Sequence, residues 1–257
     1  YNSTIISENW GALSTDGMVG YLEANNCNFI VRKSGYGTYA DGSCKVVINN
    51  SKMDTATFTG IIAAPGQIYL NNVEVTSGGS CGMIHSIGAA TDIGKLEVKG
   101  GRITTEKAVF LIKSACADLV VEDAEMSSKS GALIQSIIND DANAAKVNGQ
   151  NVTGIRATLK KMMLEGDILH EDPDRPMTIT FSDTTLKGKI KKAAISLDAG
   201  SKWTATADSE VTLLGGIDIK AIDAAKGATI TAEAGQGCTL KGDYKLAGGG
   251  TLKVKGN

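Results

Sequence analysis

Asn49-Asn50-Ser51-Lys52-Met53 is one copy of a short pattern, a small polar turn followed by an apolar anchor, that recurs along the chain. The other clear copies are Asn25-Asn26-Cys27-Asn28-Phe29, Asn71-Asn72-Val73-Glu74-Val75, Lys99-Gly100-Gly101-Arg102-Ile103 and Glu122-Asp123-Ala124-Glu125-Met126. The anchors at 29, 53, 75, 103 and 126 are spaced by 24, 22, 28 and 23 residues. Weaker copies are predicted at Ile168, Leu186 and Val211, each three residues after an acidic residue. A fixed period in this range is typical of a solenoid.

The runs beside these turns have the composition of short β-strands. Examples are Lys45-Val46-Val47-Ile48, Gln67-Ile68-Tyr69-Leu70 and Asp118-Leu119-Val120-Val121. Each run is rich in β-branched residues and is bounded by Gly, Asn, Asp or Ser. Only the stretch from Ala157 to Met163 reads equally well as a helical turn or a strand. The period is too short for helical repeats, and no leucine-rich frame is present, so the sequence predicts an all-β, right-handed parallel β-helix solenoid of about nine or ten coils.

The second residue of each turn supports this fold. Asn26, Asn50 and Asn72 occupy the same position in three successive copies, and Gly100 and Asp123 continue the series. These residue types best tolerate a left-handed backbone, and stacked Asn side chains can hydrogen-bond along a ladder. Over roughly residues 20–255 the pattern resembles the asparagine ladder of the pectate-lyase-like parallel β-helix proteins, and also the adhesin-like β-helix proteins of bacteria. The resemblance implies the fold, whereas the function varies widely within this superfamily.

Composition narrows the class of protein. We expect the 257 residues to form one β-helix domain, with 1–20 as an N-terminal coil or cap, 21–200 as the coils with the candidate site, and 201–257 as structural coils. The net charge of −2 and the absence of a basic run argue against a nucleic-acid partner, and no apolar stretch is long enough to span a membrane. The five cysteines form no Cys-x-x-Cys pair, so we expect buried free thiols, no metal site and no cofactor. The adhesin-like resemblance implies an extracellular or cell-surface location.

The residues ten positions after the anchors are Tyr39, Ala63, His85, Lys113 and Ser136, and alignment by the local sequence frames puts Gln135 in this row instead of Ser136. The local frames Met83-Ile84-His85, Leu111-Ile112-Lys113 and Leu133-Ile134-Gln135 agree with one another, and Tyr39 takes the corresponding position two copies earlier. Because alternate side chains of a strand point to opposite faces, we expect Tyr39, His85, Lys113 and Gln135 to form an outward stripe. Tyr and His can transfer protons, and a Lys beside them can stabilise a developing enolate. The alternative is a solvated face without function.

Two insertions lie near the stripe. The first, residues 139–156, offers Asp140 and Asp141 as a carboxylate base and Arg156 as a ligand for an anionic substrate. The second, residues 170–176, contains His170, which could complete the wall of a groove. Its clustered acids match no calcium loop, and a stiff polar turn is the simpler interpretation.

Two functions follow as hypotheses. In the first, the chain is a lyase, epimerase or isomerase in which His85 or Tyr39 abstracts a proton next to a carbonyl or carboxylate and Lys113 stabilises the charge. The family resemblance suggests an acidic polysaccharide as substrate, and a small carbonyl compound fits the same chemistry. In the second, the chain is a non-catalytic adhesin-like solenoid that binds glycan or protein. An enzyme requires His85 and Lys113 to share a pocket with a loop carboxylate, whereas a stalk would leave both on a flat face.

Overall fold

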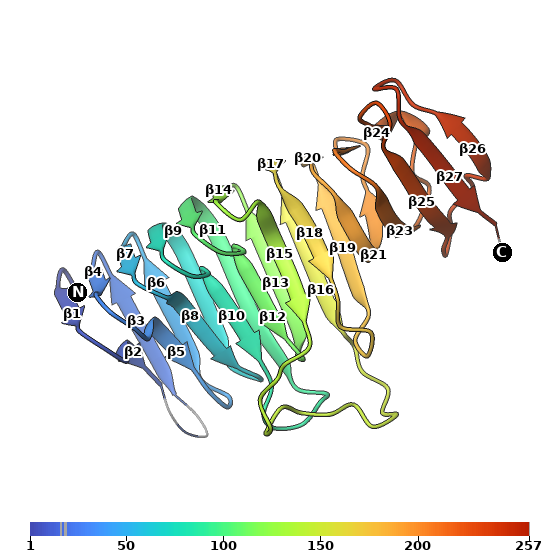
Figure 1. Cartoon of the computed structure of the whole chain (residues 1–257). Coiled ribbons are helices and arrows are strands. Elements are labelled where there is room, and N and C mark those ends of the chain that lie inside the picture. The colour runs from blue at the N-terminus through green and yellow to red at the C-terminus, as the bar shows by residue number, and fades with distance from the viewer. Residues whose placement is uncertain (16, 18–19, 257) are drawn as a thin grey trace.

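The computed structural model describes residues 1–15, 17 and 20–256, which form a stack of parallel strands (Figure 1). The strands lie on three faces, and within a face they pair with strands of neighbouring coils, except that the last four strands of the second face form a separate four-stranded sheet. Face 1 contains β3 (Tyr21–Asn25), β6 (Lys45–Asn49), the first half of β9 (Gln67–Ser77), the first half of β11 (Ile93–Thr105), β13 (Cys116–Glu122), β16 (Ile155–Lys160), β19 (Met177–Ser182), the end of β21 (Ile190–Leu197), β23 (Ser209–Leu213), β25 (Thr229–Ala234) and β27 (Thr251–Lys255). This ladder confirms the predicted parallel β-helix.

The other two faces complete each coil. Face 2 contains β1 (Thr4–Ser7), β4 (Asn28–Val31), β7 (Lys52–Thr55), the second halves of β9 and β11, β14 (Glu125–Ser128), and then β17 (Met163–Glu165), β20 (Thr185–Lys187), β22 (Lys202–Ala205) and β24 (Ile222–Ala224). Face 3 contains β2 (Gly11–Ser14), β5 (Tyr36–Ala40), β8 (Phe58–Ala63), β10 (Gly82–His85), β12 (Phe110–Lys113), β15 (Ala132–Ile137), β18 (Asp167–His170) and the start of β21. Near the C-terminus, a 3-10 turn (Ile219–Ala221) precedes β24, and β26 (Gly242–Lys245) pairs with β27 in the antiparallel sense.

The five strong anchors form one column of the core. Phe29, Met53, Val75, Ile103 and Met126 are consecutive register partners on face 2. Of the weaker copies, Leu186 lies in the corresponding column of the separate four-stranded sheet, between Leu164 and Trp203. The prediction was wrong for Ile168, which pairs on face 3, and for Val211, which pairs on face 1. The period changes after the long insertion, so counting from the earlier copies lands on other faces.

The corner between faces 1 and 2 is a single residue with a left-handed backbone. Asn26, Asn50, Asn72, Gly100 and Asp123 have φ values of 55°, 47°, 52°, 63° and 53°. Lys161 and Asp183 extend the row with φ values of 53° and 48°. The amide of Asn72 donates to Asn50 at 3.0 Å, and a second ladder lies one residue earlier, from Asn71 to Asn49 and from Asn49 to Asn25. The predicted asparagine turn is therefore present and is reinforced by two rows of side-chain amides.

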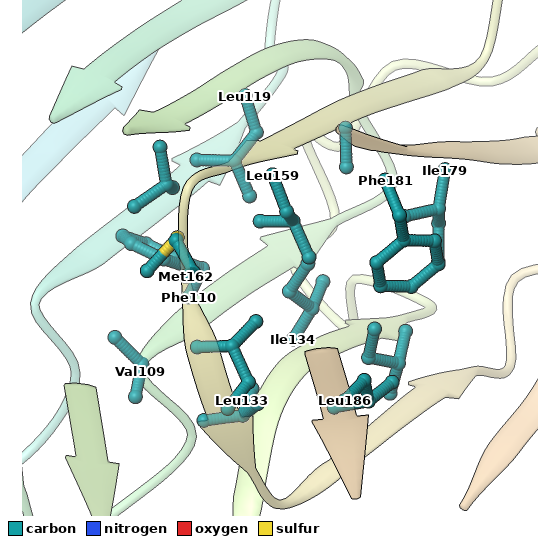
Figure 2. Close-up of a cluster of buried hydrophobic side chains, with 14 of the residues drawn as sticks. Val109, Phe110, Leu119, Leu133, Ile134, Leu159, Met162, Ile179, Phe181 and Leu186 are labelled. Atoms are coloured by element: carbon teal, nitrogen blue, oxygen red, sulfur yellow. The ribbon is translucent and has the colours of Figure 1, made fainter. Parts of the chain in front are cut away.

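The interior of the solenoid is mainly apolar. One set of buried side chains extends from Ala24 to Val254, and Figure 2 shows a part of it in which Phe110, Leu159 and Phe181 pack together. Trp203 is fully buried and donates its indole N–H to the Gly188 carbonyl at 2.9 Å, whereas Trp10 is exposed. All five cysteines are free, and four of them are buried. In the described residues, no helix is long and apolar enough to cross a membrane.

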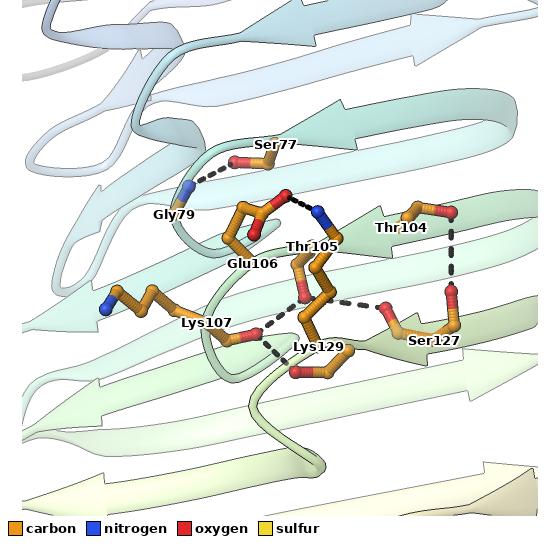
Figure 3. Close-up of polar contacts among 9 residues, drawn as sticks. Ser77, Gly79, Thr104, Thr105, Glu106, Lys107, Ser127 and Lys129 are labelled. Atoms are coloured by element: carbon orange, nitrogen blue, oxygen red, sulfur yellow. Dashed lines mark hydrogen bonds and ion pairs between the residues drawn. The ribbon is translucent and has the colours of Figure 1, made fainter.

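The corner between faces 2 and 3 is closed by hydroxyl groups. Thr105 and Ser128 both donate to the Lys107 carbonyl, at 2.7 and 2.6 Å, and Lys129 pairs with Glu106 across one coil (Figure 3). These bonds satisfy a carbonyl that no strand partner reaches, so the corner stays compact.

The third corner, between faces 3 and 1, carries the insertions. Residues 86–92, 138–154 and 171–176 leave the coil there, after β10, β15 and β18. In Figure 1 the longest of them crosses below neighbouring coils before it enters β16. It rejoins the sheet at Gly154, whose φ is +74° and where a Cβ atom would meet the Pro176 carbonyl oxygen at 2.1 Å. Only glycine fits this close approach, so the loop is anchored where it returns.

Candidate functional site

His85 and Lys113 are register partners on neighbouring coils of face 3, at the ends of β10 and β12. Both side chains point outward. Ile84 and Ile112, which directly precede them, are buried in the core, and side chains alternate between the two sides of a strand. The coil before contributes Ala63 to the same row, and the coil after contributes Ile137. Two groups able to exchange or stabilise charge therefore lie about 4.8 Å apart along the stack, with small or apolar neighbours on either side.

The long loop brings two carboxylates to this pair. It starts with the Asn139 backbone amide donating to the Ser114 hydroxyl at 2.8 Å, and Asn139 in turn accepts from the Asp141 amide at 3.2 Å. This turn places Asp140 against Lys113, with 3.1 Å between the carboxylate oxygen and Nζ. The ion pair is open to water on the aspartate side, so it holds the loop weakly and can exchange for a ligand.

These residues line one pocket of about 350 Å³. Its walls are Met83, His85, Lys113, Asn139, Asp140 and Asp141. Pockets of this size accept small molecules, and the lining here is mainly polar, with Met83 as its apolar side chain. Met83 and Asn139 were not foreseen from the sequence, although Met83 belongs to the frame that identified His85.

Burial and charge both act on the His85 imidazole. Burial beneath the loop is the main cause that lowers the pKa of His85, the Asp141 carboxylate partly opposes it, and the Lys113 ammonium lowers it further. The hydrogen bond from Lys113 lowers the pKa of Asp140. At neutral pH the pocket therefore holds a neutral imidazole, an ammonium group and an ionised carboxylate.

The loop is fixed at its middle by a buried ion pair. The Ala145 amide donates to the Ser86 carbonyl at 2.9 Å, and the Ala145 carbonyl accepts from Arg175 Nη2 at 2.8 Å. Arg175 is paired with Asp172 at 3.1 Å, and both side chains are 2% exposed. The segment 170–176, predicted as a stiff polar turn, thus also anchors the neighbouring loop, and we name Asp172, Arg175 and Ala145 the loop anchor.

Two of the sequence-derived residues lie one outward position away from His85 and Lys113. Tyr39 pairs with Ile61, which pairs with Met83, and Gln135 pairs with Leu111. The frame-based alignment of Gln135 with Lys113 was wrong by two residues, because β15 is shifted against β12 relative to their matching sequences. Tyr39 packs its ring against Tyr36, with 5.4 Å between centroids. Neither residue lines the pocket.

The remaining two candidates are further from the pocket. Arg156 projects from face 1 and makes a two-point ion pair with Asp118, at 2.6 and 2.7 Å. His170 points inward as the register partner of the buried Ser136, and it lines a separate cavity of about 220 Å³ with Asp172 and Lys192. Burial lowers the pKa of His170. It therefore supports the loop anchor region rather than the wall of the His85 pocket.

In the part of the chain that the structure describes, no three His, Cys, Asp or Glu side chains are placed to hold a metal ion. Comparisons with protein-family models, with curated proteins and with solved structures found no match.

Proposed function

We propose that the His85 pocket catalyses proton transfer at a carbon atom next to a carbonyl or carboxylate group, as in a lyase, an epimerase or an isomerase. The observation that carries this proposal is the shared pocket of His85, Lys113, Asp140 and Asp141. A flat and fully exposed stripe would instead favour a passive stalk. The family resemblance to pectate-lyase-like proteins is part of the proposal and is supported by the left-handed asparagine corner.

His85 acts as the base in this proposal. A lowered pKa keeps its imidazole neutral at pH 7, so it can accept a proton without first losing one. Asp141 favours the imidazolium that then forms, because it adds a negative charge to the pocket. The hydrogen bond from Lys113 lowers the pKa of Asp140, so this carboxylate does not compete as an acid.

Lys113 stabilises the charge that develops on the substrate oxygen. The Lys113 side chain is 25% exposed, and its ammonium group already holds Asp140, which a substrate carboxylate or enolate can replace. The volume of about 350 Å³ favours a small carbonyl compound or one sugar acid residue over a long segment of polysaccharide.

The test measures proton abstraction directly, whatever the product. The protein is incubated in D₂O with a panel of small keto acids, hydroxy acids and uronic acids, and deuterium uptake at carbon is followed by mass spectrometry. We expect uptake for at least one compound, a loss of about 100-fold or more in His85→Gln, and a comparable loss in Lys113→Met.

A matched control is Lys187→Met, since Lys187 is also an outward lysine paired with a carboxylate of a neighbouring coil, Glu165 of β17, at 3.2 Å. This variant should retain full uptake. Equal rates in Lys113→Met and Lys187→Met, or no uptake with any compound, would contradict the proposed chemistry.

A further inference from the structure

A second and larger concavity runs along the asparagine corner, away from the His85 pocket. It has a volume of about 1180 Å³ and extends from Asn2 to Met163. We name it the asparagine groove. One side is the row of corner residues Asn2, Asn26, Asn50, Asn72, Asp123 and Lys161, and the other is the outward row at the start of the face 2 strands. Six coil steps of about 4.8 Å give a length of about 29 Å, so the groove is shaped for an extended chain rather than a single small molecule.

The N-terminal half of the groove is lined by uncharged polar groups. Asn2, Asn26 and Asn50 lie on one side, and Thr4 and Asn28 lie on the other. Each amide presents a donor and an acceptor in one plane, which is the pattern that a hydroxyl group can complement from either side. The coils repeat this pattern at a constant spacing, so a ligand with hydroxyl groups at regular intervals can bond to several coils at once.

The charges in the other half cancel. Lys52 pairs with Glu74 at 3.4 Å, and Arg102 pairs with Glu125 at 2.7 Å. The lining contains three cations, Lys52, Arg102 and Lys161, and three anions, Glu74, Asp123 and Glu125. A polyanion would meet a carboxylate at every second coil, and a polycation would meet an ammonium or guanidinium group at the same interval. Such alternation disfavours either kind of charged chain.

Backbone pairing also argues against a peptide ligand. Of the strands beside the groove, β4, β7, β9 and β11 are paired with the coil before and the coil after, so they offer no free edge for an added strand, whereas β1, β14 and β17 are each paired on one side only. From β4 to β11, side chains alone therefore carry recognition.

We infer that the asparagine groove binds an uncharged, linear, polyhydroxylated chain, that is, a neutral glycan. The inference does not depend on the chemistry proposed for His85, because the two sites share no residue. No aromatic side chain lines the groove, so binding relies on hydrogen bonds and grows with the number of coils that the chain covers.

The experiment is a titration of the ¹⁵N-labelled protein in which the side-chain amide signals of asparagine are followed. The probes are cellohexaose, mannohexaose and chitohexaose, their disaccharides, hexagalacturonate, hexalysine and a seven-residue Gly-Ser peptide. We expect at least one neutral hexasaccharide to shift the Asn28 and Asn50 amide signals in a saturable way and to bind about tenfold or more tightly than its disaccharide. The charged probes and the peptide should bind more weakly.

Two asparagines give a matched pair of variants. Asn28→Ala removes a groove amide and should weaken binding of the hexasaccharide about fivefold, the effect of one lost hydrogen bond. Asn25→Ala, three residues earlier on face 1 and outside the groove, should change it less than twofold, and so should His85→Gln.

The inference is overturned if no neutral hexasaccharide binds in a saturable way, or if a charged probe or the peptide binds more tightly. It is also overturned if Asn28→Ala and Asn25→Ala lose equal amounts of hexasaccharide affinity. Loss of deuterium uptake in His85→Gln with intact glycan binding would separate the two sites. Each proposal can therefore fail without affecting the test of the other.

Discussion

Replacement of Arg175 with methionine should destabilise the protein by about 3–5 kcal/mol. Arg175 and Asp172 are both buried, and Arg175→Met leaves the Asp172 carboxylate without its partner in a site that water does not reach. Removal of one member of a buried ion pair typically costs this amount, because the remaining charge is uncompensated. The variant also loses the hydrogen bond to the Ala145 carbonyl, which adds about 1 kcal/mol.

The double variant Asp172→Asn with Arg175→Met separates the two contributions. It removes both charges, so we expect it to recover most of the loss and to leave a deficit of about 1–2 kcal/mol from the missing hydrogen bonds. The control is Lys187→Met, whose ion pair with Glu165 is more than 60% exposed on both sides and should cost less than about 1 kcal/mol.

Urea unfolding followed by circular dichroism measures the global change, read from the first transition because a solenoid can unfold in steps. Amide exchange at Ala145 measures the loop itself, since that N–H is bonded to the Ser86 carbonyl only while the loop is docked. We expect faster exchange in Arg175→Met. A loss no larger than in Lys187→Met, with unchanged exchange at Ala145, would refute the role of the loop anchor.

Three further predictions concern protonation, the asparagine corner and the core. Burial lowers the pKa of both His85 and His170 below 6.5, so the unfolded chain takes up protons first as the pH falls. The free energy of unfolding should therefore decrease below about pH 6.5. In urea titrations at several pH values, the double variant His85→Gln with His170→Asn should show a smaller decrease per pH unit. Asn50→Val should cost about 1–2 kcal/mol because of the left-handed backbone at φ 47°, whereas Asn50→Gly should cost less, and equal costs would exclude backbone strain as the reason. Trp203→Ala should cost about 3–5 kcal/mol by urea unfolding, since the side chain is fully buried, and a loss below 1 kcal/mol would show that the core refills.

The sequence was sufficient for the local part of the fold. Phe29, Met53 and Val75 could be aligned because each follows a left-handed corner residue at a fixed distance, and that corner depends on residue type alone. The weaker copies failed at Ile168 and Val211, where coils of a different length follow the insertion. A fixed count cannot follow a change in coil length.

The site was predictable only as far as it follows the strand pattern. His85 and Lys113 share a row because both end short strands with the same alternation, and the sequence shows that pattern. The path of the long loop back to Ser86, and its bond to Arg175, depend on contacts between segments about 30 to 60 residues apart. The inward direction of His170 and the cancelling charges of the asparagine groove depend on register in the same way.

The three corners of the coil have unequal freedom to change during evolution. The asparagine corner is one residue long in seven successive coils, from Asn26 to Asp183, so an inserted residue there would move every following side chain to another face. The corner after face 3 has already accepted loops of different lengths at three coils, while the strands of face 1 that follow these loops stay continuously paired. New activities in descendants of this scaffold should therefore arise by lengthening that one edge, while the opposite edge keeps its length and changes only by substitution.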